Sequence, residues 1–204
     1  MIDLQVDIII WDFDGVLINS NEIRTRSFAY ALDFLSSKDF EDFTKYHECN
    51  GGLSRYHKLD WLEKKMNVKL DKSLILERYG EMCVTEILRI KPLIKQNLEI
   101  IARNTQLLHY VASGSDQSEL RFLCKNLNIE KYFVGIYGSP KPKVEIVRDI
   151  LFKNKSQKVY LVGDSINDFD AAASNDIYFV PYNFYNKFPT YNKIVLYKWF
   201  LENL

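Results

Sequence analysis

Short apolar runs alternate along most of the chain with segments in which apolar residues recur every three or four positions. Val6 to Trp11 is a short run rich in β-branched residues, which predicts a buried strand. Four later runs predict further strands, at 107–113, 133–139, 158–164 and 177–183. Helical spacing predicts helices over 120–127, 144–152 and 169–174 and a closing helix over 193–204. Strands that alternate with helices in this way indicate βαβ units and a parallel sheet.

Between the first predicted strand and the second, the chain shows only helical spacing. Three apolar stripes lie there, at 28–35, 59–66 and 76–90, with the polar, glycine-containing segment 48–56 between the first two. Pro92 marks the start of a further segment. We therefore predict an α/β fold with a Rossmann-like parallel sheet in a three-layer core, formed by residues 1–16 and 91–204. An all-helical cap domain, residues 17–90, is inserted into it.

Composition narrows the possible functions. A chain of 204 residues suits one domain with an insertion, and its 27 basic and 27 acidic residues give no net charge, which argues against nucleic-acid binding. No window is long and apolar enough for a membrane span, and Asp3 and Asp7 interrupt the N-terminal segment, which does not resemble a signal peptide. Cys83 and Cys124 fall on apolar stripes, so we expect reduced core thiols in a cytoplasmic protein. The sequence does not indicate an oligomeric state.

Each of the first four predicted strands ends in polar residues. These are Asp12 and Asp14, then Ser113 and Gly114, then the loop 139–143, and then 163–165 with Asp168. Ligands bind at the carboxyl ends of the strands in an open parallel sheet. Because parallel strands place these ends along one edge, we expect the four clusters to form one site.

The residue types in these clusters suit a divalent metal and a phosphate group. Mg²⁺ prefers oxygen ligands, and Asp12 and Asp164 can supply two carboxylates from two strand ends, with a backbone carbonyl of the loop 12–14 as a third oxygen. Asp168 follows Asp164 by four residues and can complete the acidic pocket. The hydroxyl of Ser113 and the backbone N–H groups that open the following helix can hold a phosphate dianion.

The two carboxylates of the first cluster suit two roles in phosphoryl transfer. One can attack phosphorus and form an aspartyl-phosphate, while the other protonates the leaving oxygen and then activates water. A neighbouring anion is expected to raise the pKa of the second carboxyl. Asp12 and Asp14 alone would be ordinary turn or helix-cap residues, but the three further clusters favour the functional interpretation.

Four stretches, "DFDGVL", "VASGS", "GSPKPK" and "VGDSIND", resemble in order and spacing the motifs of the haloacid dehalogenase-like hydrolase superfamily. The resemblance covers the core and so most of the chain. It implies Asp12 as nucleophile, Asp14 as general acid and base, and Ser113 as phosphate binder. It further implies Mg²⁺ held by Asp12, Asp164 and the carbonyl of Asp14, with Asp168 supporting the water shell of the metal and the lysine. A helical insertion after the first motif is a mobile cap in this superfamily.

Individual residues also help to decide between the dehalogenase, phosphatase and phosphomutase activities of the superfamily. Its dehalogenases lack the second aspartate, so Asp14 favours phosphoryl transfer. The segment "NGGLSRYHKL" is similar to the cap loop of β-phosphoglucomutase-like members, which implies that Ser54 and Arg55 contact the substrate and that Arg55 binds a second phosphate or a carboxylate. Where those mutases carry a histidine, this chain has Arg24.

We therefore favour a Mg²⁺-dependent phosphatase of the phosphoglycolate phosphatase or β-phosphoglucomutase-like type, acting on a small phosphorylated metabolite such as a sugar phosphate. A sugar phosphomutase is the alternative. A non-catalytic binding protein that retains the fold would be indicated by the loss of a motif residue, and all the motif residues are present.

The lysine of the third motif has two candidates, Lys141 and Lys143. Lys143 opens the helix predicted from Val144, directly after Pro142, and proline is favoured at helix starts. This position favours Lys143 as the residue that faces the phosphate.

Several cap residues have two interpretations at this stage. Ser54 and Arg55 belong either to a specificity loop or to a solvated loop. Arg24 and Glu22 either line the cleft between cap and core or form a pair on a helix surface. A single cap histidine such as His47 is more often a packing residue than a ligand.

Overall fold

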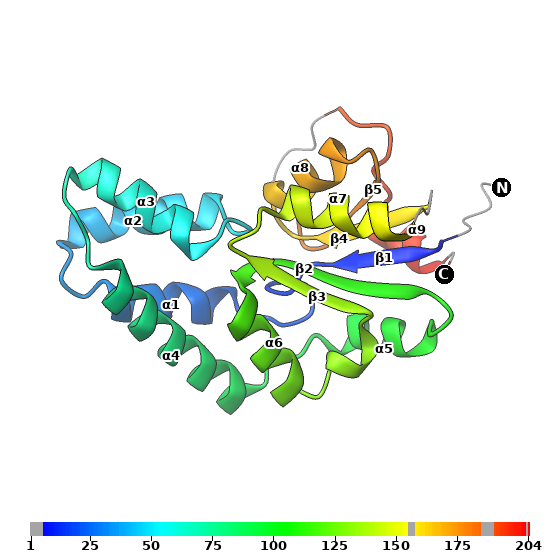
Figure 1. Ribbon diagram of the computed structural model, residues 1–204, viewed down its shortest axis with the longest axis horizontal. Helices are drawn as coiled ribbons and strands as arrows, with labels where there is room; N and C mark the ends of the chain where they lie inside the picture. The colour runs from blue at the N-terminus through cyan, green and yellow to red at the C-terminus, as the bar shows by residue number, and fades with distance from the viewer. Residues whose placement is uncertain (1–5, 155–157, 185–189, 203) are drawn as a thin grey trace.

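The computed structural model describes residues 6–154, 158–184, 190–202 and 204. Within these residues, five parallel strands form one sheet in the order β3-β2-β1-β4-β5 (Figure 1). The strands are β1 (Ile8–Trp11), β2 (Leu108–Asp116), β3 (Gly135–Ser139), β4 (Val159–Gly163) and β5 (Tyr178–Pro181). The chain starts in the middle of the sheet, continues to one side through β2 and β3, and then fills the other side through β4 and β5. The strand order therefore reverses beside β1, which is where open α/β sheets bind ligands.

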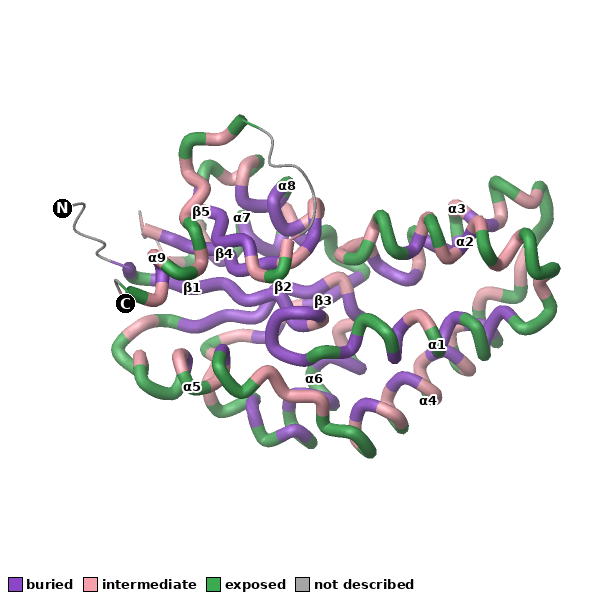
Figure 2. The backbone as a smooth tube through the Cα atoms, turned by 180° about the vertical axis from the view of Figure 1, so that it is seen from behind, coloured by how far each residue is buried: buried purple, intermediate pink, exposed green. Residues whose placement is uncertain are grey.

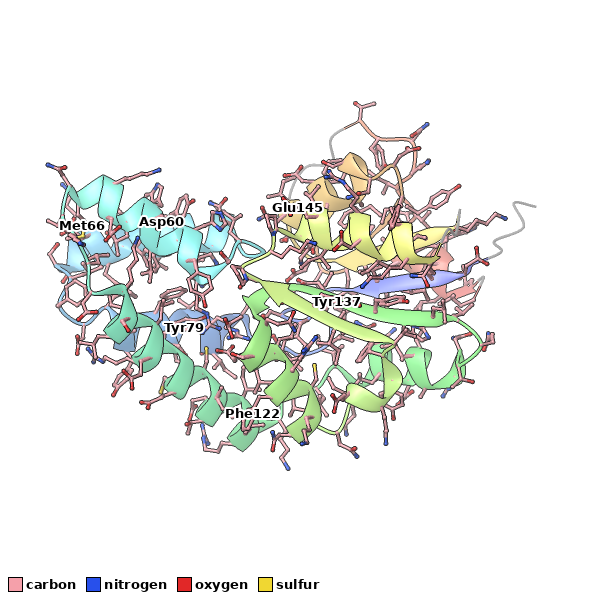
Figure 3. The ribbon with its side chains drawn as sticks, in the orientation of Figure 1. Asp60, Met66, Tyr79, Phe122, Tyr137 and Glu145 are labelled. Carbon is pink, nitrogen blue, oxygen red and sulfur yellow. The ribbon has the colours of Figure 1, made fainter. Side chains whose placement is uncertain are left out.

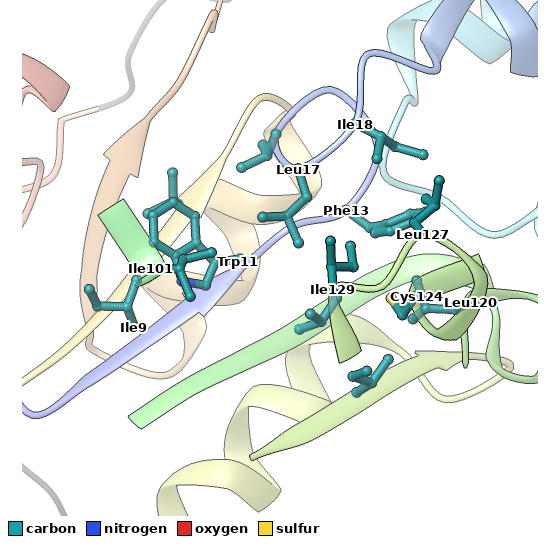
Figure 4. Close-up of a cluster of buried hydrophobic side chains, with 14 of the residues drawn as sticks. Ile9, Trp11, Phe13, Leu17, Ile18, Ile101, Leu120, Cys124, Leu127 and Ile129 are labelled. Carbon is teal, nitrogen blue, oxygen red and sulfur yellow. The ribbon is translucent and has the colours of Figure 1, made fainter. Parts of the chain in front are cut away.

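The four residues of β1 are fully buried because helices cover both faces of the sheet. Ile8 and Ile10 point to one face, where they pack with α7 (Lys143–Asn154) and α8 (Ile166–Ser174). Ile9 and Trp11 point to the other face (Figure 4). There they pack with helices α5 (Lys95–Arg103), α6 (Gln117–Asn126) and α9 (Tyr197–Glu202). A 3₁₀ turn, Glu130–Tyr132, lies between α6 and β3. The result is the predicted three-layer α/β core.

Four consecutive helices form the inserted cap at one end of the sheet (Figure 1). They are α1 (Asn21–Ala31), α2 (Ser37–Cys49), α3 (Arg55–Met66) and α4 (Lys72–Ile90). The cap has its own hydrophobic cluster, separate from the two clusters of the core. Figure 2 shows the buried segments of the cap helices beside, and apart from, those of the sheet. The buried members of the cap cluster are Phe28, Ala31, Leu32, Phe43, Leu59, Leu62, Ile75, Tyr79 and Cys83.

The two connections between cap and core run side by side. The Asn19 N–H donates to the Pro92 carbonyl at 2.7 Å, and the Ile94 N–H donates to the Leu17 carbonyl at 2.9 Å. Leu17, Ile18 and Ile87 lie within the range 17–90 but pack in the same hydrophobic cluster as the sheet. The ends of the cap segment are therefore anchored in the core.

Two helices of the structure, α2 and α5, were not predicted from the sequence because each buries few residues. Helix α2 has only two buried residues, Phe43 and His47, so its apolar stripe is too thin to be identified from spacing alone. Helix α5 likewise buries only Asn97 and Ile101.

The closing helix is shorter than its predicted range 193–204. Residues 193–195 run alongside β5 instead, with the Phe179 N–H donating to the Lys193 carbonyl and the Val195 N–H to the Phe179 carbonyl, both at 2.9 Å. The open edge of β5 can pair with these residues, and the β-branched Ile194 and Val195 suit an extended conformation.

Cys83 and Cys124 are buried in the cap and core clusters respectively, as expected, while Cys49 is exposed. Within the described residues, none of the helices combines the length and apolar character needed to cross a bilayer.

Candidate active site

A cavity of about 580 Å³ lies between the carboxyl ends of the strands and the cap. Both parts of the molecule contribute residues to its lining. The core contributes Asp12, Asp14, Ser113, Gly114 and Asp164, and the cap contributes Arg24, His47, Arg55 and Lys58. Residues of three of the four strand-end clusters that the sequence predicted to meet at one edge of the sheet therefore line this cavity, and Lys143 of the remaining cluster contacts Asp12.

Three carboxylates of the core come together at this edge. Asp12 follows β1, Asp164 follows the neighbouring strand β4, and Asp168 lies in the first turn of α8. One oxygen of each lies within 4.8 Å of the others. Asp168 Oδ2 also accepts hydrogen bonds from the backbone N–H of Ser165 at 3.0 Å and from its hydroxyl at 2.6 Å, so Asp168 caps α8 in addition to facing Asp12.

A glycine after β1 makes room for this cluster. Gly15 has a φ of +80°, a conformation that favours glycine, and a Cβ atom there would lie 1.9 Å from Asp164 Oδ2. Any side chain at position 15 would therefore displace the Asp164 carboxylate.

The buried Lys143 provides the counter-charge for two of the carboxylates. Its Nζ lies 2.8 Å from Asp12 Oδ1 and also donates to Asp168 Oδ1. Lys141, the other candidate, is exposed and pairs with Asp149. The structure therefore brings Lys143, rather than Lys141, to Asp12.

The charges and the oxygen ligands of this group of residues are compatible with a divalent cation. Burial raises the pKa of Asp12 well above its ordinary value, and the Asp168 charge raises it further, while Lys143 offsets part of the rise. Burial, followed by the Asp168 charge, raises the pKa of Asp164 to about 7. Three carboxylates beside one ammonium leave two negative charges in excess when all are ionised. Clustered carboxylate oxygens are the ligands that Mg²⁺ prefers, and its two charges would balance this excess.

Asp14 lies in a different electrostatic environment from Asp12. Its Oδ1 accepts hydrogen bonds from Arg24 Nε at 2.9 Å and from the Ser20 hydroxyl, and its Oδ2 accepts from the Ser115 hydroxyl at 2.6 Å. Burial alone would raise the pKa of Asp14, but the Arg24 charge and the hydrogen bonds outweigh it and lower the pKa. The expectation of a raised pKa at Asp14 is therefore wrong, because the dominant neighbouring charge is a guanidinium.

Glu119 of α6 joins two cap arginines to the core. Arg24 Nη1 donates to its Oε1, and Arg55 Nη2 lies 2.6 Å from its Oε2. The guanidinium of Arg55 also stacks on the ring of Tyr79, with 4.5 Å to the ring centroid; Tyr79 is labelled in Figure 3. Arg55, which the sequence suggested for a second phosphate or carboxylate, thus lines the cavity with an internal carboxylate as its partner.

Ser54 caps helix α3. Its hydroxyl accepts from the His57 N–H at 3.4 Å and lies 2.7 Å from His57 Nδ1, and Ser54 is not among the described residues that line the cavity. Of the pair considered for the cleft, both residues line the cavity, but Arg24 is buried, whereas Glu22 is exposed and makes a 3.8 Å pair with Arg26. His47 is buried against Phe28 and Phe43.

Cap and core backbones are in contact at the second strand end. Ser113 is buried, and its hydroxyl accepts from the Ser115 N–H at 3.1 Å. A Cβ atom on the next residue, Gly114, would lie 2.3 Å from the Gly52 carbonyl oxygen of the cap loop. Glycine is therefore needed at position 114 for the cap to close over the core in this arrangement.

We predict that Gly114→Ala lowers the rate of a reaction catalysed at this cavity by roughly tenfold to a hundredfold, because the cap loop must move away from the strand ends and displacing reacting groups by about 1 Å has such an effect. Steady-state kinetics with a substrate of the protein measure the effect. Gly80→Ala is the matched control, since a Cβ at this helical position has its nearest neighbour at 3.6 Å, an ordinary contact. Equal activity of both variants would show that the closed arrangement is not needed for turnover.

Sequence reasoning missed three polar residues of the site: Ser115, Glu119 and Lys58. Ser115 lies in an ordinary turn sequence, and Glu119 follows the helix cap Asp116 at a spacing typical of helix starts. Lys58 lies three residues after Arg55 on α3, so it shares a helix face with Arg55. That spacing was the one available signal for Lys58.

The sequence of this chain, which forms the parallel sheet, the acidic strand ends and the helical cap, was compared with models of known protein families. The sequence model of the haloacid dehalogenase-like hydrolases matches residues 9–181. The chain therefore belongs to the haloacid dehalogenase-like hydrolase family. Comparison with curated proteins finds no significant match.

Solved structures of similar fold agree with this assignment. CbbY from Rhodobacter sphaeroides in complex with phosphate has a TM-score of 0.73 at 16% identity, covering 97% of this chain and 96% of its own. A variant of that protein, in complex with xylulose 1,5-bisphosphate, has a TM-score of 0.70 at 15% identity over 94% of both chains.

A predicted phosphoglycolate phosphatase from Haemophilus somnus has a TM-score of 0.64 at 21% identity, covering 87% and 85%. The Bacillus subtilis protein YfnB, bound to magnesium, has a TM-score of 0.64 at 13% identity, covering 87% and 89%. At these identities the similarity establishes the fold.

Proposed function

We propose that this protein is a Mg²⁺-dependent phosphatase that hydrolyses a small phosphorylated metabolite, such as a sugar phosphate, through an aspartyl-phosphate intermediate. The observation that carries the proposal is the meeting of Asp12, Asp164, Asp168 and the buried Lys143 beside a cavity that the cap covers. The phosphate-bound and bisphosphate-bound CbbY structures and the magnesium-bound YfnB structure support it by analogy of fold.

Asp12 is the nucleophile in this proposal. Its carboxylate attacks the phosphorus of the substrate, the bond from phosphorus to the leaving oxygen breaks, and an acyl phosphate forms on Asp12. Lys143 holds the carboxylate of Asp12 in place through the 2.8 Å contact and also orients Asp168. Asp12 and Asp164, with the backbone carbonyl of Asp14, would hold Mg²⁺, and Asp168 would support its water shell. The bound metal supplies positive charge that offsets the charge of the phosphoryl group.

Asp14 is the proton-transfer residue. The contact with Arg24 and the hydroxyls of Ser20 and Ser115 keep its carboxylate ionised in the closed cap. The ionised form can accept a proton from the water that attacks the acyl phosphate, which releases inorganic phosphate and restores Asp12. In the first step Asp14, in its protonated form, donates its proton to the leaving oxygen, and the carboxylate left behind is the base that takes a proton from water in the second step. The Arg24 contact disfavours the protonated form that the first step needs. Ser113 and the backbone N–H groups after it would bind the phosphate oxygens.

We expect the protein to release inorganic phosphate from phosphorylated metabolites when Mg²⁺ is present, and to lose this activity in excess chelator, because the three carboxylates then repel one another and the phosphate. Re-addition of Mg²⁺ should restore the rate. A colorimetric phosphate assay across a panel of sugar phosphates measures both effects. Transfer of the phosphate to another hydroxyl without release would identify a phosphomutase instead, and full activity in chelator would refute the metal dependence.

A further inference from the structure

One buried cation at the cavity lacks a carboxylate partner. Lys58 of α3 is 3% exposed and lines the cavity from the cap side. Its Nζ lies 2.8 Å from Nδ1 of His47 and 3.4 Å from the carbonyl oxygen of Gly51. Among the residues that the structure describes, no carboxylate lies within ion-pair distance of it. An ammonium group has three donors, so one donor of Lys58 is left without a partner, and no carboxylate contacts its charge.

The carboxylates that contact the cap cations of the cavity pair with Arg24 and Arg55 and not with Lys58. They are Asp14 and Glu119. Two cap carboxylates, Glu22 and Glu48, also line the cavity, but both are exposed, and among the described residues neither lies within ion-pair distance of these three cations. Lys58 is therefore the cap cation of the cavity without a contacting carboxylate. Burial, followed by the Lys58 charge, lowers the pKa of His47 to about 3, so His47 is neutral and contributes an acceptor but no charge.

We propose that Lys58, held in place by His47, binds a second anionic group on the leaving part of the substrate, which is therefore a phosphomonoester that also carries a carboxylate or another phosphate. This inference rests on the proposed phosphatase function. Within it, Lys58 rather than Arg55 is the specificity-determining cation, because Glu119 already neutralises the guanidinium of Arg55.

The location of Lys58 agrees with this role. Asp14 faces the same cavity from the core, and its charge acts on Lys58. A substrate whose phosphate reaches Asp12 would direct its leaving group toward Asp14 and the cap. Burial lowers the pKa of Lys58 to about 7, with Asp14 opposing this shift and Arg24 and Arg55 adding to it. An anion that binds there would restore the protonated form.

Lys58→Met tests the inference with matched pairs of substrates. The first pair is 2-phosphoglycolate and ethyl phosphate, and the second is a short diol bisphosphate and the corresponding alkyl monophosphate. We expect the wild-type protein to prefer the member with the second charge by roughly tenfold to a hundredfold in kcat/KM, the effect of one charged hydrogen bond. In Lys58→Met this preference should disappear, mainly through a higher KM for the charged member. The pair with the larger preference identifies a carboxylate or a phosphate as the bound group.

The pH dependence of this substrate preference is a second measurement, and a lysine with only a structural role would not affect it. Above a pKa of about 7 Lys58 loses its charge, so the preference should fall as pH rises through this range. The pair of 2-phosphoglycolate and ethyl phosphate is used for this measurement, because the extra carboxylate stays ionised throughout the range, whereas a second phosphate would titrate within it. The ratio of kcat/KM for this pair largely cancels the titration of the shared phosphate and of the core carboxylates.

Two controls separate specificity from folding. Lys64→Met replaces an exposed lysine of the same helix and should leave the preference unchanged. Lys58→Met should unfold at a temperature no lower than the wild-type protein, because it removes a buried charge without an ionic partner. An equal loss of activity on both members of a pair, or a clear fall in unfolding temperature, would overturn the inference.

Binding without turnover separates this inference from the proposed function. By titration calorimetry with Mg²⁺, 3-phosphonopropionate should bind the wild-type protein roughly tenfold to a hundredfold more tightly than propylphosphonate, and Lys58→Met should bind the two equally. If this difference is seen but no phosphate ester is hydrolysed, the phosphatase proposal fails and the anion site stands. If the wild-type protein binds both equally, the anion site is refuted whatever the activity.

Discussion

Asp12→Asn should lower phosphatase turnover by roughly 10⁴-fold or more while leaving the fold intact. The asparagine side chain has nearly the same shape but cannot form the acyl phosphate, and the loss of a nucleophile affects turnover by such factors in enzymes with covalent intermediates. Uncatalysed hydrolysis of phosphomonoesters is extremely slow, so no background reaction would conceal the loss.

The fold of Asp12→Asn should persist because two effects on stability oppose each other. The substitution removes a carboxylate whose ionised form is disfavoured by burial, and it also removes one of the two partners of Lys143, which retains Asp168. We expect the midpoint of thermal unfolding to stay within roughly 5 °C of the wild-type value. Asp170→Asn is the matched control, since Asp170 is an exposed carboxylate on α8 outside the lining of the cavity. Wild-type rates in Asp12→Asn would exclude Asp12 as the nucleophile.

The parts of the molecule that were predictable from sequence are those that local pattern or motif spacing encodes. The apolar run that becomes β1 must be a buried strand, and parallel strands necessarily bring their carboxyl ends together. Asp12, Asp164 and Asp168 could therefore be placed in one cluster without knowledge of the side-chain positions. Lys143 followed from its position at the start of a helix, which is where α7 begins.

The environment of Asp14 was not predictable in the same way. Its pKa depends on Arg24 and Ser115, and Arg24 is itself held by Glu119, which lies 95 positions away along the chain. No local pattern relates a residue of a cap helix to a residue of a core helix. Lys58 was not predictable for the same reason. It stands out only because no carboxylate contacts it once the cap has packed against the core.

Lys143→Met should abolish most of the activity and also destabilise the metal-free protein, whereas Lys141→Met should do neither. Lys143 is buried between Asp12 and Asp168, and removal of one partner from a buried ionic group costs about 3–5 kcal/mol. For a chain of this length that corresponds to a fall of roughly 6–20 °C in unfolding temperature. Lys141 and Asp149 form an exposed pair, and such pairs contribute little to stability.

Adding Mg²⁺ to Lys143→Met and to the wild-type protein tests whether the metal binds the same carboxylates that Lys143 contacts. If Mg²⁺ and Lys143 neutralise the same carboxylates, Mg²⁺ should raise the unfolding temperature of Lys143→Met by more than it raises that of the wild-type protein, because the variant has more uncompensated negative charge. Activity measured with saturating Mg²⁺, well below the unfolding temperature, should still be roughly a hundredfold or more below wild type, since under the proposed function the missing ammonium would face the phosphoryl group. Equal stabilisation of both proteins by Mg²⁺ would place the metal elsewhere. Near-normal turnover by Lys143→Met together with loss of turnover in Lys141→Met would assign the catalytic lysine to position 141.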